Sequence, residues 1–189
     1  MPVKVITAPT SEPITLAEAK AHMSISDSAQ DGVIPARISA ARQWAEDYTG
    51  RSFITRTLEL AVDSFEDEME LPHGPVSAIE SIKYLDSDGV EQTLSTSVYY
   101  LDDYALVPTV NLAPDQSWPD TQSIKNAVKI RYTAGYGTAL NVPEKVRFAI
   151  NLTVSHWTKY QAPVEYGVSV TNVPAAIRSL LEPYKIHYV

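Results

Sequence analysis

The chain has 189 residues, a formal net charge of −8 and no cysteine. This length is sufficient for one well-cored domain, or for one domain that carries a sizeable insertion. Without cysteine, the chain has no disulfide framework, thiolate metal site or thiol nucleophile. No apolar run approaches the roughly 20 residues of a membrane-spanning helix, and the first residues lack a secretory pattern. The acidic balance argues against a dedicated nucleic-acid binder, which usually shows a basic domain.

The first predicted helix begins at Thr15 in a sequence typical of a capping box. The Thr15 side chain can accept from the exposed amides of the first turn, while Glu18, three residues later, bonds back to the Thr15 amide. We expect this short helix to end near residues 22–24. A polar connector follows it, up to Gly32.

A longer amphipathic helix is predicted to start between Val33 and Pro35, because proline is tolerated only in the first turn of a helix. Gly50 supplies its end, since glycine can adopt the left-handed conformation. The apolar residues recur at a four–three–four–three spacing that places them on one stripe: Ile34, Ile38, Ala41, Ala45 and Tyr48. The polar residues that fall mostly off this stripe are Arg37, Arg42, Gln43, Glu46 and Asp47.

From Phe53 onward the hydrophobic pattern alternates, which predicts strands. The sequence places them at 53–62, 76–85, 90–94, 98–101, 106–112 and 127–132, with an acidic turn at 63–70. Asp86–Gly89 has the composition of a hairpin turn. Short strands at about this spacing indicate a small antiparallel β unit. It is also acidic, because residues 55–126 contain 14 acidic and 3 basic side chains.

The chain then returns to helix after Val142-Pro143, with a broad apolar stripe over residues 146–160 that is the natural partner of the first stripe. A polar arm is predicted at 161–171 and a last short helix after Val173-Pro174. The order of helices, strands and helices predicts an α+β fold with a small helical core of about four helices. We assign residues 1–54 plus 127–189 to the helical core and 55–126 to an acidic β insertion between the second and third helices.

Motifs for catalysis or metal binding are not found in the sequence. The four histidines do not pair at the spacing of helical metal sites. Asp86 and Asp88 do not complete a calcium loop, because a third oxygen ligand and a glutamate at the twelfth position are missing. Gly135-Tyr136-Gly137 lacks the lysine and serine or threonine of a phosphate loop. We therefore predict no catalytic, cofactor or metal residue. Tyr184 and Tyr188, in an apolar tail, are candidates for a contact role.

Seven segments carry a resemblance to a known family: PITLAEAK at 13–20, AAR at 40–42, EDYTGR at 46–51, LPHGPV at 71–76, YTAGYG at 132–137, VP at 142–143 and LLEPY at 180–184. In these segments, which follow the same order along nearly the whole chain, the protein resembles the head–tail connector (adaptor) family of long-tailed double-stranded DNA phages and prophages. The resemblance is to the longer, β-inserted members. Pro35 departs from the family pattern, in which a plain helix former is expected.

The resemblance implies a virion structural protein of the neck, present in the host cytoplasm during assembly. About a dozen copies would form a ring between the portal protein and a tail-completion or stopper protein. A monomer in free solution is compatible with this role. Double-stranded DNA would pass through without specific binding, and no membrane, cofactor or active site is implied. The candidate contact residues are Arg37, Arg42, Tyr184 and Tyr188. Under this hypothesis the helical layer docks on the portal, and the acidic β insertion projects outward or toward the tail.

Two alternatives belong to other functional classes. A tail-associated hydrolase using carboxylates of the β unit would need a cleft with buried acids of raised pKa. A DNA-packaging accessory would bind DNA through arginines on a common surface. The candidates for that surface are Arg37, Arg42, Arg147 and Arg178.

Overall fold

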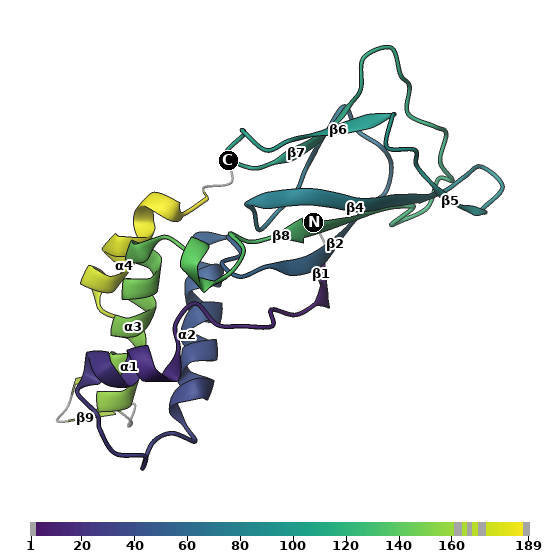
Figure 1. Cartoon of the computed structure of the whole chain (residues 1–189). Coiled ribbons are helices and arrows are strands. Elements are labelled where there is room, and N and C mark those ends of the chain that lie inside the picture. Colours follow the sequence, from purple (N-terminus) through teal and green to yellow (C-terminus); the bar gives the residue numbers. More distant parts are fainter. Residues whose placement is uncertain (1–2, 161–163, 166–167, 170–172, 187–189) are drawn as a thin grey trace. The chain divides into compact units, whose positions relative to one another are not determined.

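The structure, a computed structural model, describes residues 3–160, 164–165, 168–169 and 173–186 (Figure 1). It confirms the α+β class, with a β unit inserted between the second and third helices. The chain divides into two compact units, described separately below: a sheet unit of residues 1–10 and 55–136, and a helical unit of residues 11–54 and 137–189.

The sheet unit contains two antiparallel sheets that share one core (Figure 1). The larger sheet has the strand order β1-β2-β8-β4-β5. Its strands are β1 (Val3–Thr7), β2 (Arg56–Val62), β8 (Val128–Ala134), β4 (Val76–Leu85) and β5 (Glu91–Thr93). The smaller sheet has the order β3-β7-β6, with β3 (Glu68–Glu70), β7 (Thr109–Leu112) and β6 (Tyr99–Asp102).

Strand β8 shows why the two sheets face each other. Its residues alternate between buried and more exposed, so Ile130 and Tyr132 point into the core while Lys129 and Arg131 point outward. Tyr132 is fully buried and its hydroxyl donates to the Pro72 carbonyl at 2.8 Å, which satisfies its one polar group. Each such buried side chain contributes about 1.5–3 kcal/mol of hydrophobic stabilisation.

In its described residues, the helical unit has four helices and two short 3-10 turns, together with a pair of two-residue strands. The helices are α1 (Leu16–Met23), α2 (Ile34–Thr49), α3 (Glu144–Lys159) and α4 (Ala175–Leu181). The 3-10 turns are η1 (Ala139–Asn141) and η2 (Glu182–Tyr184). Within the predicted 161–171 arm, β9 (Val164–Glu165) pairs with β10 (Val168–Ser169), and the rest of the arm lies outside the described residues.

The two predicted apolar stripes meet in the core of the helical unit. Helices α2 and α3 pack against each other, and α4 packs against α3. From α2 the core receives Ile34, Ile38, Ala41 and Ala45, and from α3 it receives Val146, Ala149, Ile150 and Val154. The predicted pairing of the stripes is therefore confirmed.

The helix ends also agree with the sequence. Thr15 forms both halves of the capping box with Glu18, and α1 ends at Met23. Helix α2 begins at Ile34 with Pro35 in its first turn, as the tolerance of proline there predicts. Gly50 ends α2 with a φ of 70°, in the left-handed region.

The boundaries of the two units differ from the predicted ones in two segments of the sequence. Strand β1 pairs with β2, and β8 lies between β2 and β4. Residues 1–10 and 127–136 are therefore grouped with the sheet, whereas the sequence analysis placed both segments with the helices. The physical reason is that strand membership depends on a hydrogen-bonded partner far away in the chain, which the order of elements along the sequence does not reveal.

Candidate interaction surfaces

A buried ion network lies at the centre of the helical unit. Arg42 is 5% exposed and Glu46 is 3% exposed. The Arg42 guanidinium donates to a Glu46 carboxylate oxygen at 2.7 Å and to Glu12 at 2.7 Å. Burial acts to lower the Arg42 pKa, but the two carboxylates outweigh it, so the pKa is raised. This corrects the expectation that Arg42 and Glu46 lie away from the buried side of α2: each is buried because the other neutralises its charge.

Glu46 also fixes the exit from α2. Its second carboxylate oxygen accepts from the Phe53 amide at 2.9 Å, and its carbonyl accepts from the Gly50 amide at 2.8 Å. Glu46 thus connects α2 both to Gly50, which ends the helix, and to Phe53 in the segment that follows. The predicted contact residue Arg42 is engaged inside this network rather than presented to solvent.

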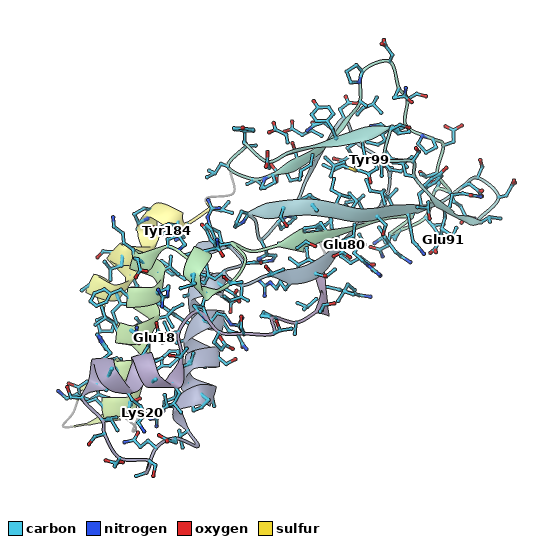
Figure 2. The ribbon with its side chains drawn as sticks, viewed as in Figure 1. Glu18, Lys20, Glu80, Glu91, Tyr99 and Tyr184 are labelled. Atoms are coloured by element: carbon cyan, nitrogen blue, oxygen red, sulfur yellow. The ribbon has the colours of Figure 1, made fainter. Side chains whose placement is uncertain are left out.

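Three hydrogen bonds fasten the C-terminal segment to the end of α2. We call the junction of these two segments, with the side chains around it, the tail clasp. The Tyr48 hydroxyl donates to Glu182 at 2.6 Å, and the Ile186 amide donates to the Thr49 carbonyl at 2.8 Å. Arg51 donates from Nε to the Tyr184 carbonyl at 2.6 Å. These bonds hold η2 and the following residues against α2, and Figure 2 marks Tyr184 on η2.

Aromatic and cationic side chains gather at the tail clasp. Trp44 stacks on Tyr48 with ring centroids 5.7 Å apart, and the Lys185 ammonium lies 5.0 Å from the Tyr48 ring centroid. The hydrogen bond to Glu182, with some burial, raises the pKa of the Tyr48 hydroxyl, so it stays a neutral donor. Trp44, Tyr48, Tyr184 and Lys185 are all partly exposed. Trp, Tyr and cationic side chains held in fixed positions are typical of contact hot spots.

The structure separates the predicted contact residues. Tyr184 is in the tail clasp, whereas Arg37 is half-buried near the start of α2 and donates to Gln30 at 3.3 Å. Eleven residues of helix place Arg37 roughly 16 Å from Tyr48 along the axis. Tyr188 lies outside the described residues. Sequence reasoning missed Trp44 and Lys185, although the four-residue spacing of Trp44 and Tyr48 is a signal for an aromatic pair on one helix face.

The sheet unit contains two hollows with acidic side chains. One of about 290 Å³ is lined by Glu66, Glu68 and Glu70 with Val62 and Met69, and another of about 470 Å³ is lined by Asp63, Ser64 and residues 121–125. The pKa values of Glu18, Asp86 and Glu91 are lowered, chiefly by hydrogen bonds to the carboxylates. A lowered pKa favours the ionised form, the opposite of what a general acid needs.

The described residues contain no group of three His, Asp or Glu side chains placed to hold a metal ion. Nor does any of their helices have both the length and the apolar character to cross a bilayer.

Comparison with protein families gives a match over almost the entire chain. The family described as head completion protein matches residues 12–187. The chain belongs to the head completion protein family. The resemblance to head–tail connector proteins is thereby confirmed at the level of the family. No curated protein matches the sequence.

Solved structures share the fold of this head completion protein over its whole length. A chain from the neck of an empty gene transfer agent (GTA) particle, computed with C6 symmetry, superimposes with a TM-score of 0.82 at 21% identity. A chain from the virion of a native GTA particle gives 0.81 at 21% identity, and one from the neck of the native particle, computed with C12 symmetry, gives 0.74 at 22%. Each match covers 100% of this chain and 97% of the other.

Proposed function

We propose that this protein is a structural component of the neck of a phage or phage-like particle, where it forms a ring between the portal and the tail. The family match over residues 12–187 carries this proposal. The full-length likeness to chains from GTA necks, solved with six-fold and twelve-fold symmetry, supports it. Rings of this kind need two different surfaces on each copy that meet head to tail and close by rotation.

The partners that we propose are the portal protein, a tail-completion or stopper protein, and further copies of the same chain. The tail clasp is the surface that we assign to the portal contact. Hydrogen bonds fix the side chains of Tyr48 and Arg51, and Lys185 lies over the Tyr48 ring, so these side chains would lose little freedom on binding. Tyr188 is two residues after Ile186, the last hydrogen-bonded residue of the clasp, and belongs to the same apolar tail of the sequence.

For DNA we propose passage without specific binding. The sheet unit contains 14 acidic and 6 basic side chains, and the helical unit contains 9 of each. Net negative charge disfavours attachment to phosphates, which bind chiefly to lysine and arginine. The alternative of a packaging accessory needs free arginines, yet Arg42 is paired with Glu12 and Glu46 and Arg147 with Glu18 and Glu144.

A catalytic role is not part of the proposal. The hydrolase alternative needs a carboxyl of raised pKa in a cleft. The lowered pKa values of Glu18, Asp86 and Glu91 do not support it, because these three residues lie outside both hollows and their shifts favour the ionised form. The proposed role is therefore structural: it requires contacts and charge, with no reacting group.

Assembly with the portal tests the proposal. The purified chain is mixed with its portal, and complexes are measured by size-exclusion chromatography with light scattering and by electron microscopy. We expect a ring on the portal. Tyr184→Ala should weaken its formation by about tenfold or more, as for a hot-spot residue, because it removes the side chain while keeping the carbonyl that Arg51 binds. The control is Tyr104→Ala, a substitution of a tyrosine that is 98% exposed in the sheet unit.

The proposal is overturned by a wild-type chain that assembles neither on its portal nor with its own copies. A monomer in free solution does not overturn it, because the ring can require the portal as a template. If Tyr184→Ala and Tyr104→Ala weaken ring formation equally, the tail clasp is not the portal contact. That result would not contradict the proposed ring.

A further inference from the structure

The outward face of the five-stranded sheet collects most of the basic residues of an otherwise acidic unit. On β8, Lys129 and Arg131 alternate with the core residues and point outward. The pairing register places Lys83 of β4 beside Lys129, and it places Glu59 of β2 beside Arg131. Lys4 of β1 is in turn opposite Glu59. The same side also carries the carboxylates of Glu59, Glu91 and Glu80, the last of which accepts from Thr57 and Thr133. With four cations to three carboxylates, the balance is weakly positive, and we call Lys4, Lys83, Lys129 and Arg131 the basic face. Four of the six lysines and arginines of the sheet unit belong to it.

The outward face of the three-stranded sheet has the opposite character. Its inward residues, Met69, Leu101 and Val110, join the shared core. Alternation along each strand therefore directs the neighbouring residues outward. The residues on this side that reach solvent are Glu68 and Glu70 on β3, Tyr100 and Asp102 on β6, and Asn111 on β7, whereas Thr109 is buried. We call this set the acidic face; none of its members is basic.

These two faces lie on opposite sides of one packed unit, because the inward sides of both sheets share a single core. Figure 2 shows this arrangement: Tyr99 lies between the sheets, while Glu80 and Glu91 mark the five-stranded sheet. A rigid unit with complementary charges on opposite sides has the property that a head-to-tail assembly requires, since each copy offers one face to each neighbour.

We propose that the basic face of one copy packs against the acidic face of the next copy, so that the sheet units form part of the contact around the ring. This inference rests on the proposed ring and adds the surfaces that join its members. Tyr100, which is 50% exposed on the edge strand β6 of the acidic face, supplies an aromatic group to that contact. Charges of opposite sign across the contact set the register and disfavour pairing of two like faces.

A second copy fits the basic face better than DNA does. Arg131 is paired with Glu59 at 2.7 Å and Lys83 with Glu91 at 2.8 Å. The pKa of Glu91 is lowered by Lys83 and, to a smaller extent, by Lys129, and Lys4 is opposite Glu59 in the strand register. DNA binding gains affinity from several uncompensated cations along the phosphate backbone. Interleaved cations and carboxylates instead match a protein surface.

Charge reversal on each face tests the inference. Lys129→Glu and Glu70→Lys each place like charges in the contact, and each should lower the association constant between copies at least about tenfold. The double variant exchanges the two charges and should recover most of the loss. Both residues are exposed, so the thermal unfolding of the variants should match that of the wild type. Assembly is measured on the portal by light scattering and electron microscopy at two salt concentrations, because screening by salt weakens exposed charge pairs.

Two matched controls carry the same changes of charge outside the two faces. Lys125→Glu matches Lys129→Glu, and Asp88→Lys, in the hairpin turn before β5, approximates Glu70→Lys. Single variants that assemble as well as these controls overturn the inference while the proposed ring stands. Binding of a duplex oligonucleotide that depends on Lys129, with assembly unchanged, overturns it in favour of DNA. A wild-type chain that assembles on nothing overturns the proposed function and the inference together.

Discussion

Among single residues, Glu46 connects several parts of the helical unit. Its carboxylate binds the Arg42 guanidinium on one side and the Phe53 amide on the other, with almost no exposure to water. Arg42 in turn reaches Glu12, 30 residues earlier in the chain. The EDYTGR segment that supports the family resemblance therefore has a structural reason: its glutamate fixes the helix exit and its arginine holds the tail clasp.

Substitution of Glu46 tests this account. Glu46→Ala leaves a buried guanidinium short of one partner and the Phe53 amide without this acceptor, so we expect the free energy of unfolding to fall by about 3–5 kcal/mol. Glu46→Gln keeps an acceptor for the amide and should cost less. Asp47→Ala, at the exposed neighbouring position, should stay within about 0.5 kcal/mol of wild type. Urea denaturation measures all three, and equal costs for Glu46→Ala and Asp47→Ala would contradict the account.

Some features of the candidate contact residues could be predicted from the sequence, and others could not. Tyr184 was predicted as a contact residue because an apolar tail with tyrosines is unusual for a frayed end, and this role stays a prediction. The burial of Arg42 and Glu46 could not be predicted from helical periodicity, since a charged residue is buried only when its partners are known. Glu12, one of those partners, precedes the first helix in a segment with no periodic pattern.

At the scale of elements, α1 is stabilised by the contacts that Glu18 makes in its first turn. Glu18 accepts from the Thr15 amide at 2.7 Å and from the Thr15 hydroxyl at 2.9 Å, and it is also paired with Arg147 of α3. These contacts, with the amide hydrogen bond as the largest, lower the pKa of Glu18 from its ordinary value of 4.5. The charged form is therefore favoured by folding.

This lowered pKa predicts how the stability of α1 depends on pH. A carboxyl with a lower pKa in the folded state contributes stability above the unfolded value of 4.5, and this stability is lost as the pH falls through the folded value. Glu18→Gln keeps an acceptor for the cap and removes the charge. Wild type should exceed this variant in stability by a constant amount near neutral pH, and the difference should shrink below about pH 4.5. Thermal unfolding between about pH 7 and pH 3 measures it, and parallel profiles for the two proteins would refute the expectation.

The elements themselves were predicted unevenly. Helices α1, α2 and α3 were placed from caps and periodicity because these signals are local. Strand β4 and its hairpin turn were also found, since Gly89, with a φ of 79°, marks the turn. Strand β1 was not assigned, because a five-residue segment becomes a strand only through its pairing with β2. The same non-local pairing moved β8 from the predicted helical core to the sheet.

At the scale of the whole molecule, charge and packing both follow the division into two units. The helical unit has equal numbers of acidic and basic residues, whereas the sheet unit has the entire net charge of −8. Each unit also has its own fully buried residues, such as Ile130 in the sheet unit and Ile150 in the helical unit. A chain organised in this way can be destabilised in one unit with little change in the other.

Paired core substitutions test that independence. Ile130→Ala and Ile150→Ala each remove the same atoms from a fully buried site, and each should cost about 2–5 kcal/mol in the unit that contains it. Hydrogen exchange measured by mass spectrometry should show faster exchange in β2, β4 and β8 for Ile130→Ala, with α2 and α3 unchanged. Ile150→Ala should give the reverse pattern. Faster exchange throughout the chain in both variants would mean that the two units unfold as one cooperative body, and the separate cores would then not correspond to separate units of stability.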